Sequence, residues 1–171
     1  SETFPFERIT PDDGLTRGAA RVLLQDRFGF IWVGTDSGLC RYDGVRFRQY
    51  YHDPNDANSL PDDDITAIVE APSGHLWIGT GDGICRYDGT TEQFSRFRQS
   101  TGTQGENTRN LVSSLALAQD GRIWYGTYGA GAFILDPNSG EFTSVESPPV
   151  APGYPSQTIN VIETSSNNKV W

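Results

Sequence analysis

One phrase of the sequence is written twice almost unchanged and a third time in looser form, and this repeat limits the fold more than any other feature. The copies are GFIWVGTDSGLCRYDG at 29–44, GHLWIGTGDGICRYDG at 74–89 and GRIWYGTYGAGAFILDP at 121–137. The tryptophans of the chain lie 45, 47 and 47 residues apart, at Trp32, Trp77, Trp124 and Trp171. This period is typical of propeller blades and of arrays of paired helices.

Each repeat predicts four short strands. Apolar, β-branched runs without a helical period precede the tryptophans and are expected to be first strands buried on both faces: AARVLLQ, ITAIVEA, LVSSLALA and TINVIET. A residue that tolerates positive φ stands three places before each tryptophan and predicts a two-residue hairpin turn, after which the tryptophan begins the second strand: Gly29, Gly74, Gly121 and Asn168. A third strand follows a further glycine turn, and a fourth lies around Phe47, Phe94 or Phe142.

Four antiparallel strands per repeat make the blade of a β-propeller, whereas 19 glycines and 10 prolines interrupt every window long enough for two helices. We therefore predict an all-β fold, a partial β-propeller of about three and a half four-stranded antiparallel blades. A single domain, 1–171, would contain an outer strand at 4–9, blades at 19–50, 64–98 and 111–145, and the start of a further blade at 158–171. The recurring Trp, Gly and Phe need no functional explanation, because blades pack face to face through large apolar side chains.

Composition and charge exclude several classes of function. The chain carries 13 Lys and Arg against 22 Asp and Glu, a formal net charge of −9, without a basic tract. Such a chain has little with which to neutralise phosphates, so we expect no binding to nucleic acid. No apolar run approaches the roughly 20 residues of a membrane span, so we expect no membrane contact by this segment. The sequence contains no methionine, which predicts a segment of a longer protein.

The repeat resembles the two-component regulator propeller repeats of bacterial hybrid histidine kinases and of some diguanylate cyclases. The resemblance rests on FERITPDDGL, on the Trp-x-Gly-Thr and Tyr-Asp motifs and on the Asn-Ser-Leu linker at 58–60, and it covers almost the whole chain. The third repeat departs from the pattern, with Ile134-Leu135 where the others have Arg41-Tyr42 and Arg86-Tyr87. This departure argues against one repeated role for the two arginines.

The resemblance implies a sensor. In that family one or two propellers of about seven blades lie in the periplasm, followed by a β-sandwich, a membrane span and a cytoplasmic signalling module. It therefore implies a periplasmic, ligand-binding segment that transmits ligand binding to a kinase or diguanylate cyclase module, with an oligosaccharide or other small molecule as the ligand. Nothing in the sequence requires a cofactor.

Two other classes of function stay open. A protein-interaction scaffold would use the same fold and bind only another protein domain. A propeller enzyme of the sialidase or streptogramin lyase type is the third alternative, since QDGRIW at 119–124 is similar to the turns of sialidases. A retaining glycosidase needs an acid and a nucleophile about 5 Å apart. Neither such a pair nor a histidine cluster is assignable, so we expect no catalytic residue and no enzymatic activity in this segment.

Loops are the expected place for a ligand, because propeller strands are occupied with packing. Two sets of loops should share one rim of the ring. The turns between second and third strands carry Asp36, Asp82 and Tyr128, and the entries to first strands carry Arg17, Asp64 and Arg109. We predict that a ligand meets these six side chains, which offer aromatic stacking and polar groups suited to a sugar.

A metal site is not predicted. His75 falls in a hairpin turn and His52 in a linker, and their spacing from Cys40 and Cys85 does not suit a four-ligand zinc site. The linker DPNDANSLPDDD at 53–64 holds five acids but lacks the order of an EF-hand loop, so its side chains should cap their own turns rather than bind calcium. Equivalent points on neighbouring blades lie about 10 Å apart, which is too far for a disulfide, so we expect both cysteines to be free and buried.

Self-association is the last expectation. A piece of a ring exposes the apolar faces of its end blades and unpaired strand edges, a combination that invites association. In an intact ring, the strand at 4–9 would complete the closing blade. A second copy can supply the absent part, since two pieces of about three and a half blades make the seven of the family.

Overall fold

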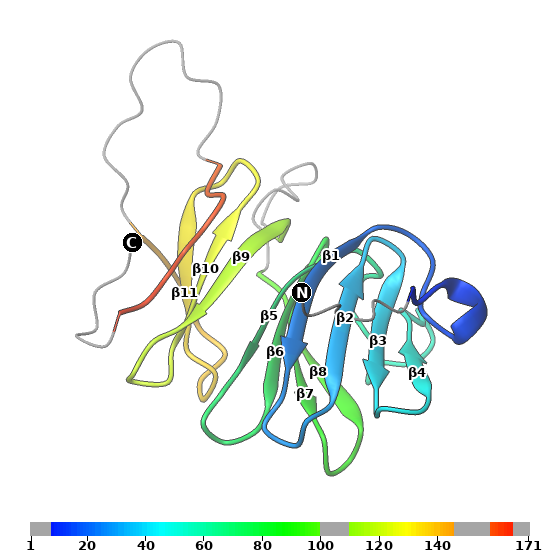
Figure 1. Cartoon of the computed structure of the whole chain (residues 1–171). Coiled ribbons are helices and arrows are strands. Elements are labelled where there is room, and N and C mark those ends of the chain that lie inside the picture. The colour runs from blue at the N-terminus through cyan, green and yellow to red at the C-terminus, as the bar shows by residue number, and fades with distance from the viewer. Residues whose placement is uncertain (1–7, 100–109, 146–157, 166–171) are drawn as a thin grey trace, which may run out of the picture.

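The computed structural model describes residues 8–99, 110–145 and 158–165, and it is built from three four-stranded antiparallel sheets (Figure 1). The only helical element in these ranges is the short 3-10 turn Pro11–Asp13. In each sheet the strand order follows the chain order. The strands are β1 (Ala20–Gln25), β2 (Ile31–Thr35), β3 (Gly38–Tyr42) and β4 (Phe47–Tyr50); β5 (Ile65–Glu70), β6 (Leu76–Thr80), β7 (Gly83–Asp88) and β8 (Gln93–Phe97); β9 (Val112–Leu117), β10 (Ile123–Thr127), β11 (Ala132–Leu135) and β12 (Phe142–Ser144).

The three sheets are arranged as the blades of a propeller. Strand β1 packs beside β5, and β5 packs beside β9, so the first strand of each blade is innermost and the fourth is outermost (Figure 1). The predicted fold class, an all-β partial propeller with four-stranded antiparallel blades, is therefore confirmed.

The hairpin turns between first and second strands differ from the expected two-residue form. In the first blade the amide of Asp26 donates to the carbonyl of Phe30 at 3.0 Å and the amide of Gly29 donates back to Asp26 at 2.9 Å, so the loop between the paired residues holds three residues. This is the type I turn followed by a left-handed residue, which explains the glycine. The φ angles are 88° at Gly29, 89° at Gly74 and 85° at Gly121. The second strands begin one residue before the tryptophan.

The threonine of the Trp-x-Gly-Thr motif has the same structural role in each of the three blades. The threonine hydroxyl of the first blade, Thr35, donates to the carbonyl of Gly38 at 2.9 Å and accepts from the amide of Ser37 at 3.1 Å, so it closes the turn into the third strand. Thr80 and Thr127 donate to the equivalent carbonyls at 2.9 and 2.8 Å. A buried hydroxyl that is fully bonded in this way stabilises the turn, whereas an unbonded one would destabilise it.

The glycine of the motif lets neighbouring blades approach each other. A Cβ on Gly79 would lie 2.6 Å from Cγ1 of Val112, the first residue of the next blade's inner strand. Gly34 and Ile65 make the same close approach between the first two blades, at 2.5 Å. The motif is therefore explained by blade-to-blade packing, without reference to a ligand.

Two apolar clusters lie between the blades, and they explain one wrong expectation. Ile68 of β5 is 6% exposed in the cluster between the first and second blades, and Leu115 of β9 is 7% exposed in the cluster between the second and third. Leu23 occupies the equivalent place in β1 but is 68% exposed. First strands were predicted to be buried on both faces. This is wrong for β1, because none of the three described blades covers it from the other side.

The two ends of the predicted domain are described only in part. Of the outer strand predicted at 4–9, residues 4–7 lie outside the described residues, and 8–9 form no strand. Of the further blade predicted at 158–171, residues 166–171, with Asn168 and Trp171, also lie outside them. Residues 158–165 run beside β9 without forming a regular strand, and the amide of Ile159 donates to the carbonyl of Thr127 at 3.1 Å. A Cβ on Gly126 would lie 2.6 Å from Ile159. A Cβ on Gly79 would lie at the same distance from Val112. The domain boundaries themselves stay a prediction.

Candidate functional site

The two sets of loops chosen from the sequence lie on one rim of the propeller. The turn after β2 and the entry to β5 are joined by a hydrogen bond from the amide of Gly38 to the carbonyl of Asp63 at 2.7 Å. Gly83 and Asn110 are joined in the same way at 2.7 Å, and Tyr128 and Leu111 at 2.9 Å. The shared rim is therefore real, whereas the ligand-binding role of its side chains stays a prediction.

Two of the six predicted residues are occupied by ion pairs within the protein. Asp64 pairs with Arg21 at 2.9 Å, and Asp82 pairs with Arg98 at 2.9 Å. The first of these pairs links the second blade to β1 of the first blade. Arg109 lies outside the described residues. The structure thus leaves Arg17, Asp36 and Tyr128 as the exposed members of the set, and Tyr128 is 47% exposed.

A shallow cavity of about 430 Å³ on this rim includes one predicted residue, Arg17. Its other walls come from the 3-10 turn, the loop before β1 and the first blade, namely Pro11, Asp12, Leu15, Ser37, Gln49 and Tyr51. The side-chain amide of Gln49 donates a hydrogen bond of 2.9 Å to the carbonyl of Gly14, which holds the loop before β1 in place. Of the predicted residues that the structure describes, only Arg17 lines this cavity.

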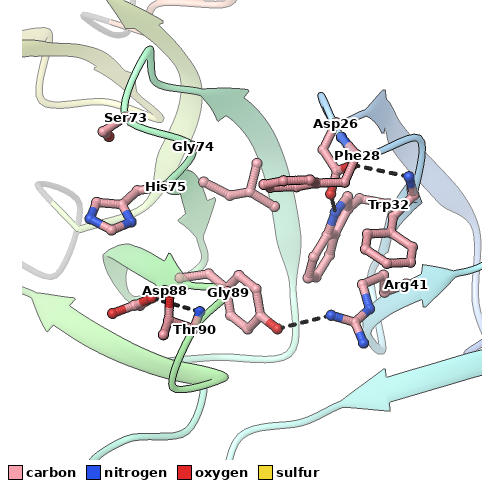
Figure 2. Close-up of a pocket in the computed structure, with 13 residues that line it drawn as sticks. Asp26, Phe28, Trp32, Arg41, Ser73, Gly74, His75, Asp88, Gly89 and Thr90 are labelled. Carbon is pink, nitrogen blue, oxygen red and sulfur yellow. Dashed lines mark hydrogen bonds between the residues drawn. The ribbon is translucent and has the colours of Figure 1, made fainter.

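A second crevice lies on the opposite rim, between the first and second blades (Figure 2). Its volume is about 330 Å³. Aromatic rings and charged side chains line it together: Asp26, Phe28, Phe30, Trp32, Arg41, His75, Tyr87 and Asp88. Sequence reasoning missed this crevice because it assigned the tryptophans and turn residues only to packing.

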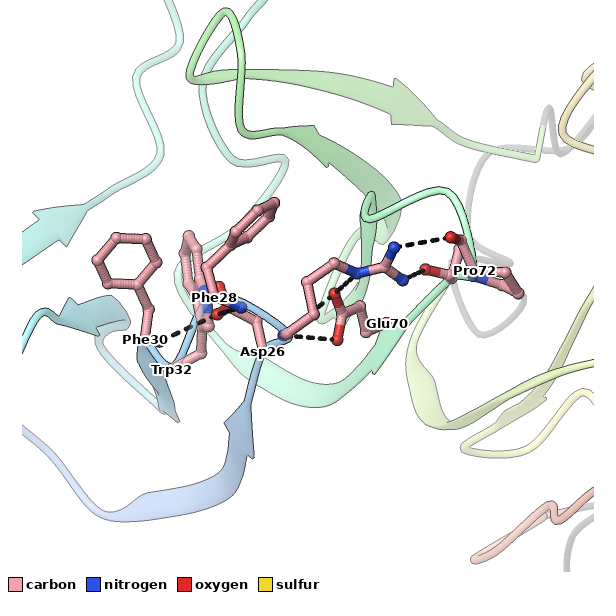
Figure 3. Close-up of polar contacts among 8 residues, drawn as sticks. Asp26, Phe28, Phe30, Trp32, Glu70 and Pro72 are labelled. Carbon is pink, nitrogen blue, oxygen red and sulfur yellow. Dashed lines mark hydrogen bonds and ion pairs between the residues drawn. The ribbon is translucent and has the colours of Figure 1, made fainter.

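Asp26 builds the aromatic wall of the crevice (Figure 3). One carboxylate oxygen accepts the amides of Phe28 and Phe30, each at 3.0 Å, and the other accepts the indole N–H of Trp32 at 2.8 Å. These bonds fix the turn that carries Phe28, whose side chain is 73% exposed. An exposed phenyl ring held by a rigid turn costs little conformational entropy when a ligand binds to it.

Arg27 fixes the two walls of the crevice relative to each other (Figure 3). Its Nε lies 2.6 Å from the carboxylate of Glu70, and its Nη atoms donate to the carbonyls of Ala71 and Pro72 at 2.7 and 2.8 Å. The arginine belongs to the first blade, and all three acceptors belong to the second. The spacing of the two hairpin turns is therefore set before any ligand arrives.

Arg41 and Tyr87 also line the crevice, and Figure 2 shows Arg41 close to Trp32. Arg41 donates to the Tyr87 hydroxyl at 3.3 Å and lies 3.3 Å from the carboxylate of Glu92, while its guanidinium lies 4.7 Å from the ring centroid of Phe30. Arg48 also pairs with Glu92. These contacts hold the pKa of Glu92 below its usual value, chiefly through the hydrogen bond from Arg48. Arg41 is therefore already paired within the protein, which favours a polar, uncharged ligand in this crevice.

The same crevice recurs between the second and third blades, with a volume of about 410 Å³. Trp77 and Arg86 take the places of Trp32 and Arg41, because each arginine is the cross-strand partner of its tryptophan. His75 lines both crevices, since its hairpin turn lies between them. The repeat therefore generates a pair of related crevices on one rim.

The remaining candidate ligands for a metal are occupied or dispersed. His52 contacts the carbonyl of Leu60 at 2.7 Å through Nδ1, on the rim opposite to His75. In the acidic linker, the carboxylates of Asp53, Asp56 and Asp62 accept amides two residues ahead at 2.8 to 2.9 Å, as expected for side chains that cap their own turns. Within the described part of the chain, no group of three or more potential ligands gathers.

Both cysteines are buried and free, as predicted. Burial raises the pKa of both thiols, more strongly for Cys85. The sulfur of Cys40 accepts the amide of Thr16 at 2.9 Å, so it tethers the loop before β1 to β3. Neither thiol is poised to act as a nucleophile, since nucleophilic cysteines have lowered pKa values.

Comparison with known proteins identifies the repeat. Residues 59–82, from the linker before β5 to the turn after β6, match the family described as two component regulator propeller. Histidine kinase P4 of Formosa agariphila is 38% identical over 60 residues, which are 35% of this chain and 4% of the kinase. The resemblance inferred from the wording of the repeats is thus confirmed.

Solved structures show the same fold. The extracellular domain of a hybrid two component system from B. thetaiotaomicron is similar with a TM-score of 0.77 and 24% identity, over 96% of this chain and 23% of that chain. Virginiamycin B lyase from Staphylococcus aureus is similar with a TM-score of 0.64 and 19% identity, over 87% of this chain and 46% of the lyase. The chain therefore spans less than half the length of each protein compared here.

These findings define the class of protein. The fold is a partial β-propeller similar to the extracellular domain of a hybrid two component system, and residues 59–82 match the two component regulator propeller family. Among the described residues, no helix has the length and apolar character that crossing a membrane requires.

Proposed function

We propose that this chain is a periplasmic ligand-sensing segment of a bacterial membrane-bound signalling protein, which transmits ligand binding to a cytoplasmic histidine kinase or diguanylate cyclase module. The observation that carries the proposal is the match of residues 59–82 to the two component regulator propeller repeat, in a chain that repeats that unit as three blades. The likeness to a histidine kinase and to the extracellular domain of a hybrid system supports the same role.

The ligand is an oligosaccharide, and it binds in the crevice between the first two blades. The exposed ring of Phe28 offers an apolar face to the C–H groups of a sugar, and Asp88 and His75 on the facing wall offer polar groups to its hydroxyls. The turns that carry these side chains are held by Asp26 and Arg27, so the site is largely preformed. Arg17, Asp36 and Tyr128 on the opposite rim are the alternative place for the ligand.

Calorimetric titration of the purified chain with a panel of neutral oligosaccharides tests this proposal. We expect one sugar to bind saturably, and Phe28→Ala to weaken its binding about tenfold, because the loss of an aromatic contact at a hot spot exceeds about 1.4 kcal/mol. Val45→Ala is the control, since Val45 is apolar and 82% exposed but does not line the crevice. Binding that is lost in Tyr128→Ala and kept in Phe28→Ala would place the sugar at the opposite rim. Binding only to another protein domain would overturn sensing in favour of a scaffold.

Enzymatic activity is not part of this proposal. The likeness to the lyase reaches the fold alone, and the two histidines of this chain, His52 and His75, lie on opposite rims. The acids that line the crevice of the first two blades are engaged as acceptors, since Asp26 holds its own turn and Asp88 accepts the amide of Thr90 at 2.8 Å. Turnover of a sugar or lactone library by the purified chain would contradict this view.

A second copy of the chain is the proposed partner at the open face of the first blade. The support is the contrast between Leu23, 68% exposed, and Ile68, 6% exposed at the equivalent place in the second blade. An apolar side chain that the repeat buries elsewhere is left in water here, and a neighbouring blade would bury it. Two copies would then close one ring.

A further inference from the structure

Arg41 has a hydrogen-bond partner and an ion-pair partner. Its partners come from the next blade: the hydroxyl of Tyr87 and the carboxylate of Glu92. Glu92 reaches the guanidinium from an unusual backbone conformation, with φ of 57°, the single positive φ of a non-glycine residue in the described part of the chain. Between the first two blades, the arginine therefore has both a hydroxyl and a carboxylate as partners.

Arg86 holds the equivalent position between the second and third blades, but both partners are absent. Tyr87 corresponds to Leu135, because each pairs with the phenylalanine of its fourth strand, and the loops that follow them have the same length. In these loops the amide of Glu92 donates to Asp88 at 2.8 Å, and the amide of Gly140 donates to Asp136 at 2.8 Å. Glycine thus stands where the carboxylate of Glu92 would be, with a similar φ of 74°.

The consequence is an arginine without a counter-ion. Among the described residues Arg86 makes no hydrogen bond or ion pair, and its Nε is buried without a partner. Arg86 is half-buried, and a buried N–H without an acceptor costs free energy. An anion bound from solution would remove that cost.

The one carboxylate in the lining of this crevice is already engaged. Asp120 lies 2.7 Å from Nη2 of Arg122 and also accepts its Nε at 2.8 Å. The hydrogen bond from Arg122 is the main cause that lowers the pKa of Asp120. The charge of Asp120 is thus matched by Arg122, and Arg86 is left as the unmatched cation.

We propose that the crevice between the second and third blades binds a hydroxylated carboxylic acid of monosaccharide size, with its carboxylate on the guanidinium of Arg86. Arginine offers paired N–H groups that match the two oxygens of a carboxylate. Ser73, His75 and Asn138 in the walls provide polar groups for hydroxyls, and Pro72 and Pro137 provide apolar surface. The cavity of about 410 Å³ has room for one sugar acid. This crevice shares Ser73 and His75 with the neutral-sugar crevice of the proposed function, but its carboxylate subsite at Arg86 does not depend on that function.

Titration of the ¹⁵N-labelled chain with galacturonate, followed by nuclear magnetic resonance, tests the proposal. Galactose is the matched neutral probe, because it has a hydroxymethyl group where galacturonate has a carboxylate, and inorganic sulfate is the matched anion without a sugar ring. We expect galacturonate to shift the indole signal of Trp77 saturably, and galactose and sulfate to bind at least about tenfold more weakly. Equal binding of galactose or of sulfate would overturn the proposal.

Two variants probe the cation from opposite directions. Arg86→Gln removes it, and Gly140→Glu restores the carboxylate that the repeat supplies to Arg41; a Cβ at Gly140 meets no atom within 4 Å, so the side chain has space. Each should weaken galacturonate binding about tenfold or more. Arg46→Gln is the control, since it removes an equal charge from an exposed loop of the first blade and should leave binding unchanged. Unchanged binding in Gly140→Glu, with the fold intact by circular dichroism, would refute the role of Arg86.

Discussion

Replacement of Gly79 by alanine tests whether the motif glycine serves the approach of neighbouring blades. The added methyl group would lie 2.6 Å from Cγ1 of Val112 and 3.2 Å from Oγ1 of Thr66. Gly79 is not among the glycines with positive φ, so alanine meets no backbone strain there. Any loss of stability must therefore come from the contacts of the added methyl group, chiefly the clash with Val112 of the third blade.

The expected loss is about 2 kcal/mol of unfolding free energy, the middle of the range for an extra methyl group forced into a packed core. For a chain of 171 residues this corresponds to a melting temperature lowered by about 6 °C. Urea denaturation followed by tryptophan fluorescence measures the free energy, and thermal denaturation followed by circular dichroism measures the melting temperature. Gly89→Ala is the control, because the nearest atom to its added Cβ is 3.9 Å away. It should change stability by less than about 0.5 kcal/mol.

The double variant separates a steric clash from a general weakening. Val112 is fully buried, so Val112→Ala alone should cost about 2 kcal/mol. It also removes the atom that the added methyl group at 79 would contact. The loss of unfolding free energy in the double variant should therefore be smaller than the sum of the two single losses by about 1 kcal/mol or more. Additive costs, or a Gly79→Ala protein as stable as Gly89→Ala, would refute the reasoning.

Three further outcomes follow from burial and charge. Cys40 and Cys85 are buried with raised thiol pKa values, so neither should react with a thiol reagent at pH 8 until urea unfolds the chain; rapid reaction of the native protein would contradict this. The pKa of Glu92 is below its ordinary 4.5 in the fold, so its stabilising contribution is complete above about pH 4.5 and disappears as the pH falls through the folded-state value. Glu92→Gln should therefore flatten the loss of stability between pH 6 and pH 3, as measured by urea midpoints. Leu23→Asp should convert a sedimenting dimer into a monomer, and a wild-type chain that sediments as a monomer at micromolar concentration would count against association through the first blade.

The strands were predictable because the same local sequence signals occur in each of the three repeats. Glycine before the tryptophan, threonine after it and apolar runs on either side each have one structural cause, and these causes act together at every blade. What the sequence could not show was the context of a given copy. Leu23 and Ile68 are similar apolar residues at equivalent positions, and only the presence of a blade on one side decides that the first is exposed and the second buried. The three-residue hairpin loops were missed because a glycine with positive φ suits two loop lengths.

The sequence places the six predicted site residues in loops, but it does not show which partners each side chain has in the fold. Asp64 and Asp82 lie in loops, which suggested a ligand, but Arg21 and Arg98 form ion pairs with them. The crevices on the other rim involve Arg41 and Arg86, which the sequence had marked as a feature that the third repeat lacks. The sequence showed that the third repeat lacks this arginine. It did not show that the partners of each arginine come from the next blade.

This dependence between neighbouring blades changes how a departure from the repeat is to be interpreted. Ile134 stands in the third blade where Arg41 and Arg86 stand in the other two, which by itself argues against a repeated role. Leu135 and Gly140 of the same blade have a different consequence, because they remove the hydroxyl and the carboxylate from the arginine of the blade before it. A substitution that is neutral within its own blade therefore creates an unmatched charge at the boundary. In a propeller, where each blade contributes half of two interfaces, binding sites are best sought where one blade keeps a charged side chain and the next blade has lost its partner.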